Sequence, residues 1–240
     1  MDATLQSALA IAIAVVLCIV AYKKQLMTPW ATLVAFVLAG SSGIICGLEW
    51  EIVFILFPLF GFAATLFRFD EKKQKGLQEG KHGERRLLNI LGVSIVPFAI
   101  VIVSSITSGE NFQLAMAFMS AFAVSTSDTL ASELGIRDSK VYMITNGRPC
   151  EPGTNGGVSV YGLAVSSVGS IVFGVIAYYI MFQEFSVWML VPGIAGIIGN
   201  LMDSVEGALL ENKGYMSKYT VNASTSLIGA VVGSLIAAFA

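Results

Sequence analysis

The sequence predicts an all-α, polytopic transmembrane helix bundle of about eight spans, folded as a single domain with both termini on the non-cytoplasmic side. Of the 240 residues, 55% are hydrophobic and only 12% are charged, which is about half the charged content of a typical soluble domain. Apolar stretches also recur at a length of about 20 residues, which a helix needs to cross a bilayer. Finally, basic residues gather in alternate connections, as they do in membrane proteins. The composition excludes a disordered chain and argues against a soluble globular enzyme.

The eight predicted spans follow one another with short connections. They cover residues 4–22, 29–48, 51–69, 87–107, 111–130, 157–182, 186–207 and 220–239. We do not expect the first to be a cleaved signal peptide, because Asp2 and no basic residue precedes it and no A-x-A site precedes Lys23. The fifth is short and rich in small residues, so we expect other helices to surround it. In the seventh, Gly193, Gly196 and Gly199 recur every three residues, which predicts a closely packed neighbouring helix.

The distribution of basic residues supports this number of spans. All fourteen Lys and Arg residues lie in the connections 23–28, 70–86, 131–156 and 208–219, or at the adjoining helix ends. The opposite side carries acids such as Glu49, Glu51, Glu110 and Glu184. The positive-inside rule therefore places the basic connections in the cytoplasm. Without the fifth span, basic residues after it would fall on the wrong side. We expect an integral protein of the cell membrane.

Several chemistries are disfavoured by composition alone. The net charge of −2 gives no basic excess for binding nucleic acid. The three cysteines show neither CxxC nor Cys/His spacing, so no zinc site or disulfide framework is indicated. The sole histidine, His82, lies in a charged stretch, which argues against a histidine-dependent catalytic triad.

A first polar cluster follows the apolar part of the fifth span, at residues 125–133. If this segment is helical, Asp128 and Ser132 share a face and Glu133 lies beside it. An acid placed among apolar residues at membrane depth is costly, and is a functional candidate by default. The alternative is a helix end with capping and solvated acids.

A second cluster, at residues 146–157, is rich in glycine and proline and leads directly into an apolar helix, which predicts an irregular loop. Gly153, Gly156 and Gly157 permit positive φ angles, so consecutive amides could form an anion-binding nest. The helix that follows adds its positive N-terminal end, and Arg148 could add a cationic fork. The alternative is a plain connecting turn, since no GKS or GKT completes a Walker A motif.

A third cluster lies in the seventh span, where Asn200, Asp203 and Glu206 recur every three residues. Oxygen ligands of this kind suit Mg²⁺, which usually takes one or two carboxylates plus substrate phosphates. Arg85 and Arg86, at the entrance of the fourth span, could reach a phosphate, whereas the other basic residues of 70–86 are typical of topology and headgroup attraction. Together these groups suit phosphoryl transfer, although an ion pathway would also use buried acids.

Five motifs carry a resemblance to a known family. They are SDTLASELG (127–135), NGRPCEPGTNGGVS (146–159) and GNLMDSVEGALLE (199–211), with GERRLLNILG (83–92) and VNASTSLIG (221–229) matching more weakly. Over about residues 60–240 the chain resembles an integral membrane family that includes the plant phytyl-phosphate kinase of vitamin E synthesis and the animal transmembrane protein 19. Ser127, Leu130 and Leu87 depart from its usual pattern.

The resemblance implies a prenyl-phosphate kinase. Such an enzyme transfers a phosphoryl group from CTP or another nucleoside triphosphate to an isoprenyl or phytyl monophosphate, with Mg²⁺ as cofactor. Its active site would lie on the cytoplasmic side of the bilayer. A CTP-dependent cytidylyltransferase acting on a lipid phosphate and an ion-coupled transporter remain alternatives.

Specific roles follow for the residues of the three clusters. We expect the catalytic residues to be Asp128, Glu133, Asp203 and Glu206, and the Mg²⁺ ligands to be Asp128, Asn200, Asp203 and Glu206. The expected phosphate-binding residues are Arg86, Arg148, Thr154, Asn155, Gly156 and Gly157.

Overall fold

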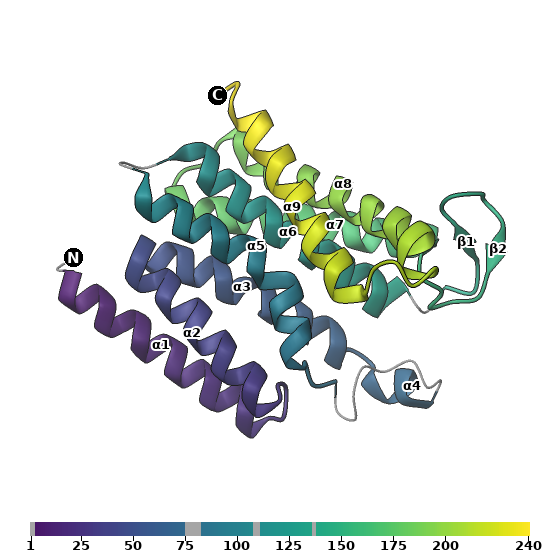
Figure 1. The fold of residues 1–240 in the computed structure, drawn as a ribbon, viewed down its shortest axis with the longest axis horizontal. Helices are drawn as coiled ribbons and strands as arrows, with labels where there is room; N and C mark the ends of the chain where they lie inside the picture. Colours follow the sequence, from purple (N-terminus) through teal and green to yellow (C-terminus); the bar gives the residue numbers. More distant parts are fainter. Residues whose placement is uncertain (1–2, 75–82, 108–110, 136–137) are drawn as a thin grey trace.

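The computed structural model describes residues 3–74, 83–107, 111–135 and 138–240, and it is an elongated bundle of roughly aligned helices (Figure 1). Its first half contains α1 (Ala3–Lys23), α2 (Pro29–Cys46), α3 (Leu48–Leu66), the short α4 (Phe69–Gln74), α5 (Leu87–Ile106) and α6 (Phe112–Gly135). Its second half contains β1 (Val141–Met143), β2 (Pro149–Cys150), β3 (Gly157–Val158), α7 (Val160–Phe182), the 3₁₀ turn η1 (Val187–Met189), α8 (Leu190–Glu206), the π-helical turn η2 (Gly207–Glu211) and α9 (Lys218–Ala237). Within the described residues, eight helices are long and apolar enough to cross a membrane, which confirms the predicted all-α membrane fold.

Helix α6 lies at the centre of the bundle. It packs against α3, α5, α7, α8 and α9, and 78% of its most apolar window is buried, more than in any other described span. On the α3 side, Trp50 and Phe54 contact Phe118 and Phe122, with ring centroids 4.6 and 4.9 Å apart. The expectation that other helices surround the fifth span is therefore confirmed.

The glycines of α8 allow this helix to approach its neighbours closely. A Cβ atom built on Gly196 would lie 2.8 Å from the carbonyl oxygen of Ala123 on α6, and one built on Gly193 would lie 2.6 Å from Cα of Ile171 on α7. Real Cβ atoms essentially never come so near to backbone. The predicted close packing along this face is confirmed, and it sets the position of α8 against α6.

The connection between α6 and α7 contains a small antiparallel sheet in the order β2-β1-β3, in which Val141 pairs with Cys150 and Tyr142 with Val158. The prediction of an irregular loop over 146–157 was therefore wrong at Pro149–Cys150 and at Gly157. Proline is tolerated at a sheet edge, which is where Pro149 lies in β2. The sixth predicted span, 157–182, also begins later than expected, because β3 occupies Gly157–Val158. Ser159 caps α7, since its hydroxyl accepts a hydrogen bond from the Gly162 N–H at 3.0 Å.

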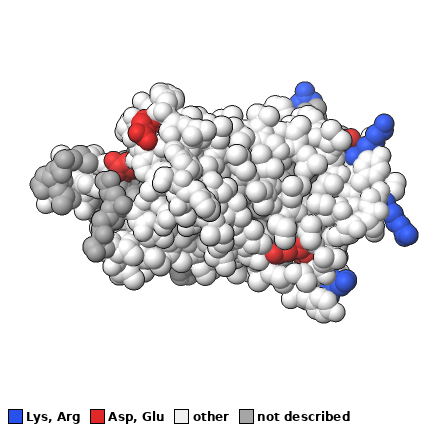
Figure 2. Space-filling model, turned by 90° about the horizontal axis from the view of Figure 1, so that it is seen from above, with Lys and Arg blue, Asp and Glu red and all other residues white. Residues whose placement is uncertain are grey.

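The two termini lie at the same end of the bundle (Figure 1), and the Lys and Arg side chains visible in Figure 2 lie at the other end. This arrangement agrees with the charge pattern that predicts the membrane orientation. The orientation itself stays a prediction, and Lys75, Lys81, His82, Glu110 and Arg137 lie outside the described residues.

Candidate functional site

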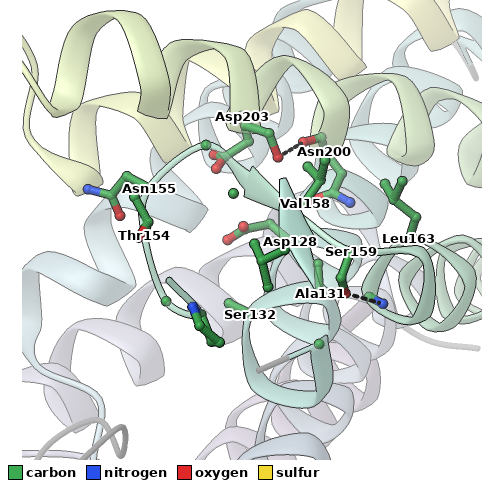
Figure 3. Close-up of a pocket in the computed structure, with 18 of the residues that line it drawn as sticks. Asp128, Ala131, Ser132, Thr154, Asn155, Val158, Ser159, Leu163, Asn200 and Asp203 are labelled. Atoms are coloured by element: carbon green, nitrogen blue, oxygen red, sulfur yellow. Dashed lines mark hydrogen bonds between the residues drawn. The ribbon is translucent and has the colours of Figure 1, made fainter. Parts of the chain in front are cut away.

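A cavity of about 420 Å³ lies at the end of the bundle opposite the termini, where α6 and α8 meet the β2–β3 connection and the start of α9 (Figure 3). The three polar clusters singled out in the sequence all contribute to it. Its lining includes eight of the predicted site residues: Asp128, Glu133, Thr154, Asn155, Gly156, Gly157, Asn200 and Asp203. Segments far apart in the sequence therefore form one site.

Two aspartates from different helices face the same space. Asp128 on α6 and Asp203 on α8 both extend toward the segment that carries Thr154 and Asn155 (Figure 3), and their carboxylates are near enough to interact electrostatically. The Asp203 Oδ2 also accepts a hydrogen bond from the Thr225 hydroxyl of α9 at 3.3 Å. Like charges held in one place favour a cation between them.

The arrangement fits a magnesium ion completed by substrate. Among the described residues, no group of three or more His, Cys, Asp and Glu side chains could hold a metal by itself. Mg²⁺ is, however, commonly bound by one or two carboxylates plus substrate phosphates and water. Asp128 and Asp203 meet that requirement. Asn200 lines the same cavity, and its Nδ2 donates to the Ser166 hydroxyl at 3.2 Å.

Glu206, in contrast, does not line the cavity. Its Oε1 accepts a hydrogen bond from the Ser224 hydroxyl of α9 at 3.0 Å, and its Oε2 is buried without a hydrogen bond to any described residue. At 3.6 residues per turn, six residues after Asn200 correspond to a net rotation of about 120° around the helix. The predicted stripe on α8 therefore turns away from the cavity, and the structure does not support Glu206 as a ligand there.

Glu133 lines the cavity, but its carboxylate is held by cations. The Lys72 Nζ donates to Oε2 at 2.7 Å and the Arg85 guanidinium donates to Oε1 at 3.1 Å. The Thr65 hydroxyl also donates to Oε1, at 2.8 Å. Both oxygens are thus engaged by α3, α4 and the start of α5. This pattern favours a role in holding helix ends together, rather than the metal or catalytic role expected from the sequence.

The glycine-rich segment approaches the end of α8 closely. Gly156 has a φ of +80°, and a Cβ atom there would lie 2.5 Å from the Ala208 Cβ and 2.8 Å from the Ser204 carbonyl oxygen. A residue with a side chain would be strained on both counts. This position therefore requires glycine.

Only part of this segment is available as an anion-binding nest. The N–H groups of Thr154 and Gly157 donate to carbonyl oxygens within the segment, at 3.2 and 2.9 Å. Among the described residues, none accepts a hydrogen bond from the N–H of Asn155 or of Gly156. These two consecutive amides are the candidates to bind a phosphate oxygen.

The predicted cationic residues lie elsewhere. Arg86 and Arg148 are exposed and line neither this cavity nor the smaller one beside it. Arg148 lies in the β1–β2 turn, where its N–H bonds to the Asn146 side chain at 2.9 Å. Sequence reasoning missed Lys218, which lines the cavity from the first turn of α9 together with Asn222 and with Glu211 of η2. The sequence feature that could have pointed to Lys218 is the weakly matching motif at 221–229, which lies close to it.

Comparisons with known proteins agree with the membrane architecture. The family model described as integral membrane protein DUF92 matches residues 12–237. An uncharacterised membrane protein of Methanocaldococcus jannaschii is 32% identical over 192 residues, covering 80% of this chain and 77% of the relative. The chloroplastic protein VTE6 of Arabidopsis thaliana is 28% identical over 189 residues, covering 75% of this chain and 54% of the relative. No solved structure matches the chain significantly.

Proposed function

This chain belongs to the DUF92 family of integral membrane proteins, and from that membership we propose that it is a membrane-embedded prenyl-phosphate kinase. It would transfer a phosphoryl group from a nucleoside triphosphate, CTP being the first candidate, to an isoprenyl or phytyl monophosphate. The protein VTE6 of Arabidopsis thaliana is among the relatives of the chain, and the motifs given above resemble those of a family that includes a plant phytyl-phosphate kinase. The observation that carries the proposal is that Asp128, Asp203 and the Asn155–Gly156 turn line one cavity.

The location of the cavity suits two substrates of opposite solubility. A prenyl chain has to stay among apolar helices, whereas a nucleotide comes from water. The cavity lies at the ends of α6 and α8, beside connections that carry basic residues. An enzyme that joins a lipid phosphate to a nucleotide phosphate needs its reacting groups at such a boundary.

The charges around the cavity explain why the reaction would need a divalent cation. The cavity is lined by the carboxylates of Asp128, Asp203 and Glu211. Glu133 also lines it, but Lys72 and Arg85 already pair with its carboxylate. Among the described lining residues, Lys218 carries the single cationic side chain. Such a site would repel a polyphosphate unless a cation neutralised part of the charge. Bound Mg²⁺ would supply that neutralisation, with Asp128, Asp203 and Asn200 as the residues to hold it.

The chemistry asks little more of the protein. The nucleophile is a phosphate oxygen of the prenyl monophosphate, which is already ionised at neutral pH and needs no general base. A bond forms from this oxygen to the terminal phosphorus of the nucleotide. The bond from that phosphorus to the nucleoside diphosphate breaks, and the leaving group keeps the electron pair. The protein's part is to position phosphates, for which the amides of Asn155 and Gly156 and the Lys218 side chain are placed.

Label transfer in detergent micelles tests the proposal. The assay mixes purified protein with Mg²⁺, a terminally labelled nucleoside triphosphate and phytyl or geranylgeranyl monophosphate. The lipid products are then separated and identified by mass spectrometry. We expect label in a prenyl diphosphate, formed about 1000-fold more slowly by the Asp128→Asn protein. A nucleotidyl adduct with release of pyrophosphate would instead indicate a cytidylyltransferase. The absence of both products across the common nucleotides would contradict the proposal.

One observation favours transport as a second candidate. Glu51, near the start of α3, is fully buried, and neither carboxylate oxygen has a hydrogen bond to a described residue. Ionisable groups inside a membrane protein often mark ion pathways. Glu51→Gln should leave phosphoryl transfer within twofold of wild type if the protein is a kinase. Loss of proton or cation flux in liposomes on the same substitution would favour a transporter.

A further inference from the structure

A second cavity adjoins the first and differs from it in character. Its volume is about 60 Å³, and α3 and α5 supply half of its lining residues. Phe57 and Phe62 of α3 and Ile90 and Val93 of α5 give it apolar walls. Val93 is buried within the bundle, whereas Val103 on the same helix is 43% exposed. The second cavity therefore has an apolar character that the first, with its carboxylates and amides, does not share.

Polar groups line one part of this second cavity. Arg85, in the connection before α5, and Asn89, in the first turn of α5, contribute to it. The backbone of Arg85 is fixed by the α1–α2 connection, because its N–H donates to the Leu26 carbonyl at 2.9 Å and its carbonyl accepts from the Thr28 N–H at 3.0 Å. The guanidinium is fixed as well, by Thr65 and Glu133. A cation held in place beside apolar walls matches a ligand with one anionic end and one hydrocarbon end.

The two cavities share part of their lining. Asp128, Ser132, Lys218 and Asn222 border both of them. A ligand in either cavity would thus contact the same carboxylate and the same ammonium group. Phosphoryl transfer needs the attacking and leaving oxygens roughly in line across one phosphorus atom. Two cavities that share Asp128 and Lys218 would let an acceptor phosphate and a nucleotide phosphate meet beside the same two side chains.

We infer that the second cavity binds the phosphate end of the prenyl monophosphate, while the first cavity binds the nucleotide. This inference rests on the proposed phosphoryl transfer and adds to it the place of each substrate. The acceptor phosphate would lie by Arg85, Asn89 and Lys218, and its first carbons would contact Phe57 and Val93. The small volume excludes a whole prenyl chain, so the rest of the chain would extend beyond the cavity. The acceptor oxygen would attack from the α3–α5 side of Asp128, and the nucleoside diphosphate would leave on the α7–α8 side.

Gly61 offers a substitution that fills the second cavity selectively. It lies on α3 in the cavity lining, and a Cβ atom there would meet only the Thr129 Cγ2, at an ordinary contact distance of 3.7 Å. Alanine therefore fits without displacement, whereas leucine projects further into the available space. The pair Gly61→Ala and Gly61→Leu separates the presence of a side chain from its bulk at one position.

The kinetic experiment measures KM for each substrate separately. We expect Gly61→Leu to raise KM for geranylgeranyl monophosphate at least tenfold and to leave KM for the nucleotide within twofold. Gly61→Ala, which adds only a methyl group, should raise KM for the lipid less than Gly61→Leu does. Val93→Trp should act like Gly61→Leu, and Val103→Trp, on the exposed face of α5, should act like wild type. An equal rise in both KM values, or no rise for the lipid, would overturn the assignment.

Photolabelling gives a readout that does not depend on turnover. Wild-type protein is irradiated with a diazirine-tagged geranylgeranyl monophosphate, with and without an excess of the untagged lipid, and the labelled peptides are mapped by mass spectrometry. Competed label on α3 near Phe57–Phe62 and on α5 near Asn89–Val93 supports the inference. Competed label on α7 or α8 overturns it, as does no competed label at all. If no nucleotide transfers its phosphate, the kinase proposal fails, while the labelled peptides still decide where the lipid phosphate binds.

Discussion

The Lys72 ammonium nitrogen lies 2.7 Å from the Glu133 Oε2, and both side chains are buried. Lys72 also donates to the carbonyl oxygens of Ala64 and Thr65, at 2.8 and 3.2 Å, in the last turn of α3. It therefore satisfies backbone groups that the end of a helix leaves without partners. One side chain of α4 in this way joins α3 to the end of α6 that borders the cavity.

Removing one partner of this pair should destabilise the protein. Lys72→Met leaves a buried carboxylate with fewer compensating charges, so we expect the free energy of unfolding to fall by about 3 kcal/mol. Unfolding by sodium dodecyl sulfate in mixed micelles, followed by tryptophan fluorescence, measures the loss. The exposed Lys213→Met is the control, and the double variant Lys72→Met/Glu133→Met should recover part of the loss. Equal stability of the two single lysine variants would show that the pair is not structural.

Asp128→Asn should separate chemistry from folding. The amide is nearly the same size as the carboxylate, but it lacks the negative charge that would help to hold Mg²⁺ between two substrate phosphates. We expect turnover to fall about 1000-fold, which corresponds to about 4 kcal/mol in the activation barrier, with unfolding unchanged. Glu49→Gln, an exposed acid near the opposite end, is the matched control. Near-normal turnover by the Asp128 variant would remove this carboxylate from the mechanism.

Asp203 and Glu206 differ in a way that a magnesium titration detects. Asp203 lines the cavity and Glu206 faces α9, so Asp203→Asn should raise the Mg²⁺ concentration for half-maximal activity at least tenfold. Glu206→Gln should shift it less than twofold. Removal of divalent cations with a chelator should abolish transfer by the wild type, and added Mg²⁺ should restore it. A larger shift for Glu206 than for Asp203 would reverse the assignment made from the structure.

Alanine substitutions at two glycines with positive φ separate the effect of a steric clash from that of backbone strain. Gly156→Ala introduces both, since its φ is +80° and a Cβ there would lie 2.8 Å from the Ser204 carbonyl oxygen. Gly147→Ala introduces backbone strain alone, because its φ is +66° and nothing lies within 4 Å of a Cβ built there. We expect each to cost about 1 kcal/mol of strain. Only Gly156→Ala should also raise KM for the nucleotide, about tenfold. Similar kinetics in the two variants would count against the Asn155–Gly156 nest.

The cation that faces the nucleotide should be Lys218. Lys218→Met removes a charge that borders both cavities, and we expect KM for the nucleotide and KM for the prenyl monophosphate each to rise about tenfold. Arg148→Met, on the exposed β1–β2 turn, should change either KM less than twofold. Steady-state kinetics at fixed Mg²⁺ compares the two. A larger effect at Arg148 would show that the turn closes over the substrate.

Much of the fold could be predicted because a membrane constrains local sequence strongly. Each span needs a long apolar stretch, and the buried position of α6 follows from its many small and polar residues. We expected Asp128 and the glycine-rich segment to lie in one site, because both belong to the motifs that carry the family resemblance. In contrast, the pairing of Glu133 with Lys72 joins residues 61 positions apart and depends on how α3 and α4 end. Likewise, the direction in which Arg85, Arg86 and Glu206 point depends on helix rotation, which no local pattern fixes.

The central position of α6 has a consequence for biogenesis. Its mean hydropathy of 1.3 is among the lowest of the eight spans, and 78% of its most apolar window is covered by protein. A segment that carries hydroxyl and carboxyl groups enters hydrocarbon unfavourably by itself. We therefore expect the translocon to retain α6 until later helices emerge from the ribosome. Asp128 would then reach its final depth in the bilayer only after the C-terminal spans have been synthesised.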